Sequence, residues 1–224
     1  MLRQLADDLW VTERSQRFLG IEVGTRMTVV RLADSSLLLH SVVPLDAELR
    51  TELDALGAVR HVVAPNRYHH LYVGDYAGAY PQATLFAAPG LAGKRPDIRF
   101  HETLETGREY PWSSAIDHQV CDGMPALSET VFLHKASRSL VVTDLAMNID
   151  ATSPLSARLF ARVGGIYGKP GLSWIERSLW LRDKRAAADS LEKVRAWEFD
   201  RVVMAHGNIL ENARGASLGS ALRF

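Results

Sequence analysis

Residues 61–90 read HVVAPNRYHHLYVGDYAGAYPQATLFAAPG, and this stretch decides the fold. It holds two short apolar runs, His61–Ala64 and Thr84–Ala88, and a proline follows each of them. Short apolar runs that end in turn residues are typical of buried strands. The polar residues between the two runs, which include His69 and His70, therefore lie on the segment that leaves one strand and leads to the next.

The residues before this stretch predict a hairpin and a helix. Met27–Leu32 and Leu37–Val43 are rich in strand formers, and the Ala-Asp-Ser-Ser sequence between them favours a turn. Asp46–Leu56 has leucines at helical spacing and acidic residues early in the segment. Gly57 is a natural stop for this helix.

The second half of the chain adds another hairpin and more helices. The runs TVFL (130–133) and SLVVT (139–143) predict the hairpin. Helices are predicted over 154–163 and 183–197, and a buried strand, RVVMA, over 201–205. The first of these helices has an apolar face made of Leu155, Leu159 and Val163. Together these elements predict a layered α/β protein with mixed sheets.

The composition is that of a folded protein without a dominant charge. The 224 residues include 47% apolar and 23% charged side chains, which excludes a disordered or fibrous chain. The 26 basic and 26 acidic residues cancel, so we expect no nucleic-acid or membrane partner. The sequence has no membrane-length apolar run, and its first residues, MLRQLADD, do not resemble a signal peptide. The single cysteine, Cys121, cannot form an intramolecular disulfide, so we expect a cytoplasmic protein. We also expect a single domain over residues 1–224.

Imidazole and carboxylate groups follow three of the predicted strands. His69 and His70 come shortly after the HVVA strand, Asp144 directly follows SLVVT, and His206 directly follows RVVMA. Because ligand sites of α/β sheets gather beyond the carboxyl ends of strands, we expect these side chains to converge. Imidazole nitrogens and carboxylate oxygens suit zinc or iron. The sequence therefore predicts a metal site with nitrogen and oxygen ligands.

This order of elements resembles the metallo-β-lactamase-like hydrolase fold. Members of that superfamily have an H-x-H-x-D-H loop after a strand, a mid-chain histidine, an aspartate that ends a later strand and a last histidine near the C-terminus. More closely, about residues 8 to 210 resemble a bacterial domain family of unknown function related to that fold. The segments that carry this resemblance are GTRMTVVRL, LLLHSVVPLD, APNRYHHLYVGDYAGAYPQATLFAAPGLAGKRPDI and SRSLVVTDLAMNI. The resemblance implies a four-layered αββα sandwich, in which two mixed β-sheets face each other and helices lie outside.

Departures from the superfamily pattern reduce the metal complement that the resemblance implies. If His69-His70 stands for the Asp-His pair that ends the motif, Pro65 and Arg67 occupy the two earlier histidine positions, and neither binds metal. Met124 stands roughly where the mid-chain histidine would fall. The three-histidine site of the superfamily is then lost.

The second metal site of the superfamily keeps a candidate ligand at every position. In this register the ligands are His69 (in place of Asp), His70, Asp144 and His206. These residues supply three or four donors, so we expect at most one zinc or iron ion per chain. An alternative register aligns the motif with Asn66, Tyr68, His70 and Leu71, and it leaves three candidate ligands.

A metal-dependent hydrolase is the leading functional hypothesis. A single ion with an open position would lower the pKa of a bound water toward ~7 and so produce hydroxide at neutral pH. Ester, thioester, lactone and phosphoester bonds of a small-molecule substrate all suit this chemistry. Asp75 is a candidate catalytic base, with a turn or helix N-cap as the alternative role for it.

The alternative hypothesis is a non-catalytic protein that binds a small molecule in the inherited cleft. A degenerate metal-binding motif is what a fold that has taken on another function would show. Metal-based redox chemistry is a third hypothesis. The sequence has neither a P-loop nor a G-x-G-x-x-G motif, which argues against P-loop nucleotidases and dinucleotide oxidoreductases. The aromatic stretch Ile166–Leu181 fits core packing, a helical lid over the cleft or a homodimer face.

Overall fold

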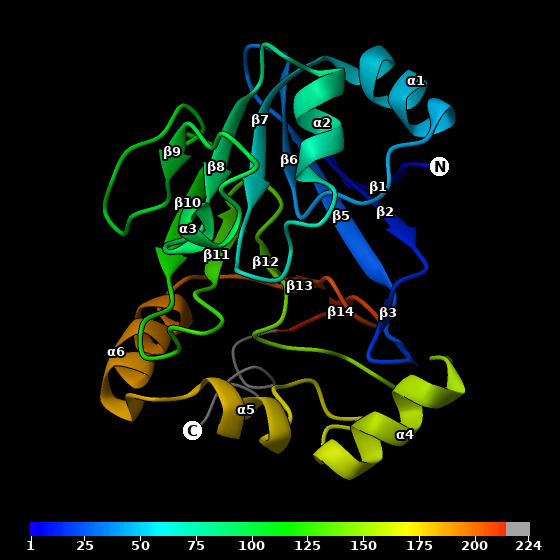
Figure 1. Ribbon diagram of the computed structural model, residues 1–224, viewed down its shortest axis with the longest axis vertical. Helices are drawn as coiled ribbons and strands as arrows, with labels where there is room; N and C mark the ends of the chain where they lie inside the picture. Colours follow the sequence, from blue (N-terminus) through cyan, green and yellow to red (C-terminus); the bar gives the residue numbers. More distant parts are fainter. Residues whose placement is uncertain (214–224) are drawn as a thin grey trace.

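Strands β7 (Ala58–Ala64) and β8 (Thr84–Ala87) form a parallel pair in the stretch that the sequence singles out. They belong to a computed structural model, which describes residues 1–213. The helix α2 (Val73–Ala79) leads from β7 to β8. Together with α1 (Ala47–Leu56), it packs on the outer face of the sheet that contains both strands (Figure 1).

The larger sheet has seven strands in the spatial order β1–β2–β5–β6–β7–β8–β9. Its other members are β1 (Arg3–Ala6), β2 (Leu9–Arg14), β5 (Thr25–Arg31), β6 (Ser36–His40) and β9 (Glu102–Thr103). Strands β5 and β6 are antiparallel neighbours, so the first hairpin is confirmed. The helix α1 begins at Asp46, whose side chain accepts the N–H of Leu49 at 2.8 Å, as its helix-start pattern predicts.

The smaller sheet has five strands in the spatial order β10–β11–β12–β13–β14. Their bounds are β10 (Ile116–Val120), β11 (Thr130–His134), β12 (Ser139–Val142), β13 (Arg201–Met204) and β14 (Leu210–Glu211). Strands β11 and β12 form the second hairpin, and β13 pairs with β12 in parallel. The helix α6 (Lys184–Arg195), capped by Asp183, covers the outer face of this sheet.

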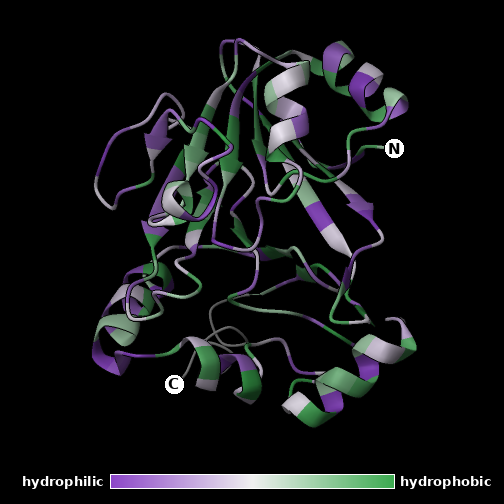
Figure 2. Ribbon diagram, viewed as in Figure 1, coloured by the Kyte–Doolittle hydropathy of each residue, from purple (hydrophilic) through white to green (hydrophobic). Residues whose placement is uncertain are grey.

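The two sheets face each other across a shared apolar core. Leu38 and Val63 of the larger sheet lie in one buried cluster with Phe132, Val141 and Val203 of the smaller sheet. Figure 2 shows β6, β7 and β8 as mainly hydrophobic ribbons, whereas α6 carries many hydrophilic residues. With α1 and α2 outside one sheet and α6 outside the other, the four-layered αββα sandwich is confirmed.

The carboxyl ends of β7, β12 and β13 meet at one edge of the sandwich. Strands β6, β7 and β8 run parallel to one another, and β12 runs parallel to β13. Asn66 follows β7, and its side chain donates to Asp144, which follows β12. A small hairpin, β3 (Arg17–Phe18) and β4 (Ile21–Glu22), lies near the same edge and contacts Tyr68 through Phe18.

The helix α4 (Leu155–Gly164) faces the other way from the apolar stripe that the sequence suggests. Leu155, Leu159 and Val163 are exposed, because Ala157 and Ala161 make the buried face. Small alanine side chains let the helix lie close against the chain at Met147 and Ile149. The two outward leucines, Leu155 and Leu159, are 74% and 62% exposed.

Two short helices complete the fold, α3 (Leu91–Lys94) and α5 (Trp174–Trp180). In α5, Trp180 is buried and its Nε1 donates to the hydroxyl of Tyr68 at 3.3 Å, whereas Trp174 is 54% exposed. One end of the aromatic stretch is therefore core. Among residues 1–213, no helix has the length and apolar character to cross a membrane.

Candidate metal centre

The turn after β7 is shaped by Asn66. Pro65 has no N–H to give a sheet, so the strand ends before it. The side-chain Oδ1 of Asn66 accepts the backbone N–H groups of Tyr68 and His69, both at 2.7 Å. An asparagine that bonds the backbone ahead of it makes a local turn of this kind. The turn carries His69 to the edge where the two sheets meet.

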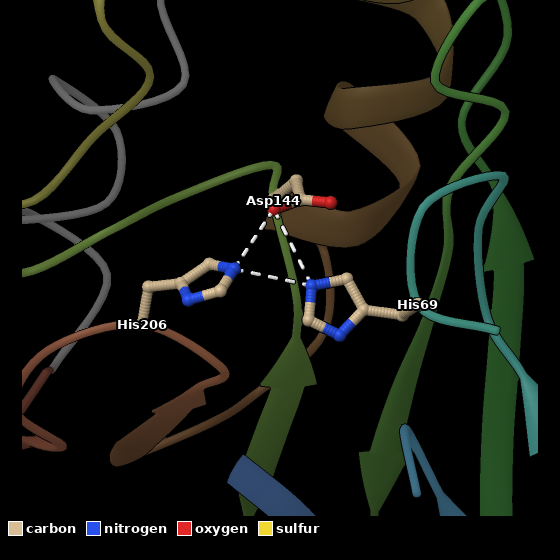
Figure 3. A group of neighbouring side chains, drawn as sticks. All are labelled: His69, Asp144 and His206. Carbon is tan, nitrogen blue, oxygen red and sulfur yellow. Dashed lines mark hydrogen bonds and ion pairs between the residues drawn. The ribbon is translucent and has the colours of Figure 1, made fainter. Parts of the chain in front are cut away.

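His69 is held by Ser41, the residue that follows β6. The Oγ of Ser41 lies 2.7 Å from Nδ1 of His69. Ser41 has a φ of 59°, in the left-handed region that few residues other than glycine adopt, so the chain turns sharply where it leaves the strand. With Nδ1 engaged, the Nε2 of His69 faces Asp144 and His206 (Figure 3).

Asp144 follows β12 and is held from two sides. The buried Glu129 accepts three consecutive backbone N–H groups, those of residues 143–145, at 2.7, 2.8 and 3.0 Å. The Nδ2 of Asn66 donates to Oδ2 of Asp144 at 2.7 Å. The other carboxylate oxygen, Oδ1, therefore faces the two histidines.

His206 follows β13 by two residues and is buried, with 6% of its surface exposed. Its Nδ1 lies 2.8 Å from the carbonyl oxygen of Gly24, which precedes β5. Because a carbonyl only accepts, Nδ1 carries a proton, and neutral His206 presents a lone pair at Nε2. The fixed ring thus points a metal-binding atom at Asp144.

Donor atoms of these three residues meet at one place (Figure 3). The Nε2 of His206 lies 3.1 Å from Oδ1 of Asp144, and the Nε2 of His69 lies 3.4 Å from the same oxygen. The two Nε2 atoms are 3.1 Å apart. In a tetrahedral zinc site with bonds of about 2.0–2.1 Å, the donor atoms lie roughly 3.3 Å from one another. The spacing therefore fits one shared ion.

The same three groups need a positive charge among them. With the proton of His206 on Nδ1, its Nε2 and the Asp144 oxygen are two facing acceptors, which repel unless a proton or cation lies between them. Burial would lower the pKa of His206, but the hydrogen bond and charge of Asp144 raise it above its usual value. Burial would raise the pKa of Asp144, but His69 and His206 hold it well below its usual range. A bound cation would satisfy all three groups at once.

Two other predicted site residues lie outside this group. His70 is buried, and its Nδ1 lies 2.8 Å from Nη1 of Arg95. Because a guanidinium only donates, Nδ1 must accept, and the proton of neutral His70 sits on Nε2. Burial, with the charges of Lys94 and Arg95, lowers the pKa of His70 to about 4. Asp75 lies on the exposed side of α2. Metal binding by His70 and catalysis by Asp75 stay predictions.

Several residues that support the group were not predicted from the sequence. Ser41, Asn66 and Glu129 contact the group or the backbone beside it, and of these only Asn66 had a signal, as part of the Pro-Asn turn. Glu176, in α5, belongs to the same surroundings. Burial and the charge of Asp144 raise the pKa of Glu176 to about 7, against hydrogen bonds from Ser173.

In the register that pairs His69-His70 with the Asp-His pair of the motif, the positions of the three-histidine site hold no metal ligand. Met124 is buried in the core beneath α6, and Arg67 donates from Nη1 to the carbonyl oxygen of Pro125. Within residues 1–213, His69, Asp144 and His206 form the one group with the spacing of metal ligands.

A serine motif lies outside the described residues. Residues 215–219 read GASLG, which matches the G-x-S-x-G pattern. In α/β-hydrolases that motif stands on a sharp strand-to-helix turn at the top of the sheet. This chain instead has two facing sheets, so the motif gains no support from the fold.

Comparison with solved structures finds metallo-β-lactamases. The metallo-β-lactamase from Pontibacter korlensis has a TM-score of 0.68 and 12% identity, over 99% of this chain and 98% of that chain. The one from Hirschia baltica has a TM-score of 0.65 and 10% identity, over 100% and 98%. FIM-1 from Pseudomonas aeruginosa, solved in a mono-zinc form, has a TM-score of 0.66 and 9% identity, over 99% and 94%. Identities this low show a shared fold alone.

Comparison of sequences identifies the family. No curated protein is similar enough in sequence to count as a relative. The family described as a domain of unknown function, DUF4336, matches residues 6–163, which is more than half of the chain. The chain therefore belongs to the DUF4336 family and has the metallo-β-lactamase-like fold.

Proposed function

We propose that this protein is a metal-dependent hydrolase that holds a single zinc or iron ion between His69, Asp144 and His206. The observation that carries the proposal is the triangle of their donor atoms, with sides of 3.1, 3.1 and 3.4 Å. In each residue the remaining polar atom of the ring or carboxylate is already bonded elsewhere. Such outer contacts orient metal ligands and strengthen them.

The chemistry divides between the ion and the chain. A zinc or iron ion at this place would act as a Lewis acid toward a carbonyl or phosphoryl oxygen and would lower the pKa of a water molecule. Ser41 and the Gly24 carbonyl hold the two imidazoles in the orientation that presents Nε2. Asn66 holds one oxygen of Asp144, so that the other is presented. Three protein ligands are the usual number at a catalytic zinc site, because a fourth position must stay open.

The substrate that we propose is a small molecule with an ester, thioester, lactone or phosphoester bond. We place its hydrolysis in the cytoplasm, because the one cysteine, Cys121, is buried and unpaired. Asp75 is not needed for the proposed metal site.

Two neighbouring histidines give a matched test of the metal site. The metal content of the protein, purified without a histidine tag, is measured for the wild type, His69→Ala and His70→Ala. We expect about one equivalent in the wild type and in His70→Ala, and none in His69→Ala, because His70 bonds Arg95 instead. Two equivalents in the wild type, or equal loss in both variants, would contradict this assignment.

A metal-free binding protein is the second candidate, and one observation favours it. A single shared proton between His206 and Asp144 would also satisfy the buried pair without any ion. Reconstitution with zinc, iron and manganese at neutral pH separates the two candidates. Retention of one ion that Asp144→Asn abolishes supports the hydrolase, whereas no retention of any of the three ions supports the binding protein.

A further inference from the structure

Two cationic side chains, Arg67 and Lys94, are fixed beside the loop that carries His69. The Nζ of Lys94 donates to the main-chain oxygen of Arg67 at 2.6 Å and stands 4.8 Å from the centre of the Tyr68 ring. The Nη1 of Arg67 donates to the main-chain oxygen of Pro125 at 2.9 Å. Both cations are therefore held by the backbone or an aromatic ring: Arg67 precedes His69 by two residues, and Lys94 contacts residues 67 and 68 of the same loop.

Neither cation is neutralised. In residues 1–213, neither Arg67 nor Lys94 has a carboxylate within ion-pair distance, whereas the neighbouring Arg95 is paired with Asp97 at 2.6 Å. Burial and then the charges of Arg67 and Arg95 lower the pKa of Lys94, so these like charges lie close enough to repel one another. Unpaired like charges held together are unfavourable unless an anion joins them.

Arg67 also has an unused hydrogen-bond donor. Its Nε is buried, and no atom of residues 1–213 accepts its proton. Lys94, which is exposed, uses one of its three N–H groups on the Arg67 oxygen. Buried donors without partners are rare in folded proteins and commonly mark a place for a ligand or ordered water. Arg67 therefore keeps one unpartnered N–H group, and Lys94 keeps two.

The surroundings add another donor rather than an acceptor. His70 follows His69, and its Nδ1 lies 2.8 Å from Nη1 of Arg95, the residue after Lys94. Because Arg95 donates to its Nδ1, neutral His70 carries its proton on Nε2. The ring of His70 therefore presents a donor, not an acceptor, at Nε2.

We propose that Arg67 and Lys94 bind an oxyanion, a phosphate or a carboxylate, of the substrate whose reactive bond lies at the His69–Asp144–His206 group. This inference rests on the proposed function, and it names the substrate class as an anionic ester. The guanidinium and ammonium groups suit oxyanions because they offer charge-assisted hydrogen bonds, which are shorter and stronger than neutral ones. Because Lys94 contacts Tyr68, the residue before His69, an anion bound by it would lie beside the loop that carries His69.

Titration with inorganic phosphate tests the subsite directly. Phosphate affinity is measured by calorimetry for the full-length wild type, Lys94→Gln and, as the matched control, Lys193→Gln, an exposed lysine in the last turn of α6. We expect the Kd to rise roughly tenfold in Lys94→Gln, as for the loss of one hydrogen bond to a charged group, and to be unchanged in Lys193→Gln. Equal affinity in all three proteins, or equal weakening in both variants, would overturn the proposal. A parallel titration with acetate separates a carboxylate site from a phosphate site.

Arg67→Lys provides a second variant, which keeps the charge and removes Nε. It should weaken phosphate binding while leaving the circular dichroism spectrum and Tm as in the wild type. Unchanged phosphate affinity in a folded Arg67→Lys protein would remove Nε from the subsite and contradict the proposal.

Hydrolysis of two esters then links the subsite to the reaction. Lys94→Gln should raise the KM for the 4-nitrophenyl monoester of succinate, which has a free carboxylate, and leave the KM for 4-nitrophenyl acetate unchanged. An equal KM change for both esters would contradict the oxyanion role. If no ester is hydrolysed by the metal-loaded wild type, the proposed hydrolase function fails, while the phosphate titration still decides the subsite.

Discussion

The guanidinium of Arg26 holds the loop that carries His206. Its Nη2 donates to the carbonyl oxygen of Gly207 at 2.7 Å, across 181 residues of sequence, and its Nη1 donates to the carbonyl oxygen of Met204. Arg26 is buried, with 5% exposed, and Glu13 balances its charge at 2.8 Å. One side chain of the larger sheet therefore fixes the backbone on both sides of His206.

Replacement of Arg26 by Lys should reduce both stability and metal retention. Lysine keeps the charge but cannot reach both carbonyl oxygens, because it lacks the planar fork. We expect a loss of about 2–3 kcal/mol in the free energy of unfolding, as for the loss of a hydrogen bond from a buried charged group. Metal affinity should fall roughly tenfold or more, as for the loss of an outer contact of a ligand.

Arg31→Lys is the matched control for this change. Arg31 lies on the same strand, and its ion pair with Asp8 is half exposed. Exposed pairs of this kind contribute only about 0–1 kcal/mol, so Arg31→Lys should leave urea unfolding and metal content almost unchanged. A similar effect of both replacements would show that Arg26 does not act through the His206 loop.

Asn66→Asp should be strongly destabilising. The Nδ2 of Asn66 lies 2.7 Å from Asp144 and 3.2 Å from Glu129, so an added carboxylate would face two others in a buried place. We expect a loss of about 3 kcal/mol or more at pH 7, measured by urea unfolding. Asn208, which also donates to an aspartate, at 2.9 Å, lies nearer the surface and provides the control. Equal losses for Asn66→Asp and Asn208→Asp would contradict the role of burial.

The sequence predicts best those elements that depend on residues close together in the chain. Both hairpins and the helices that begin at Asp46 and Asp183 follow from local turn and helix-start patterns, and the structure has all of them. The strand β10 reads IDHQV, which has no apolar alternation, and it forms because β11 pairs with it along its whole length. Elements of that kind depend on distant partners.

The candidate site divides in the same way. His69, Asp144 and His206 could be found because each follows a strand. The supporting contacts could not, because their partners are distant in sequence: 78 residues separate Asn66 from Asp144. His70 has the same residue type and nearly the same position as His69, yet its ring bonds Arg95, 25 residues later, and lies outside the group.

The stability of the protein should depend on Glu176 above pH 4.5. Its pKa is raised to about 7 by burial and by Asp144, so folding favours the protonated acid. The stability from this group is fully present below pH 4.5 and is lost as the pH rises through 7. Glu176→Gln, which can keep the capping box with Ser173, should therefore be more stable than the wild type by about 1–3 kcal/mol at pH 8 and equal to it at pH 4.5.

Thermal unfolding of the metal-depleted protein at the two pH values checks this expectation. The control is Glu192→Gln, at an exposed position of α6, which should match the wild type at both. The stability difference between Glu176→Gln and the wild type should be larger at pH 8 than at pH 4.5. An equal difference at both pH values would show that Glu176 is ionised in the fold without an energetic cost.

The stability of the protein should fall in acid partly because of His40. This side chain is 3% exposed, its Nε2 has no partner among residues 1–213, and burial followed by the charge of His69 lowers its pKa to about 3. Because the fold holds the neutral ring, its contribution is full above pH 6.5 and is lost as the pH falls from 6.5 toward 3. One such group adds a slope of about 1.4 kcal/mol per pH unit in that window.

His40→Leu removes the titration while filling similar space, so urea unfolding between pH 4 and 6 should show a shallower slope by roughly that amount. A His40→Leu protein with the wild-type slope would mean that His40 reaches solvent or a partner when it is protonated.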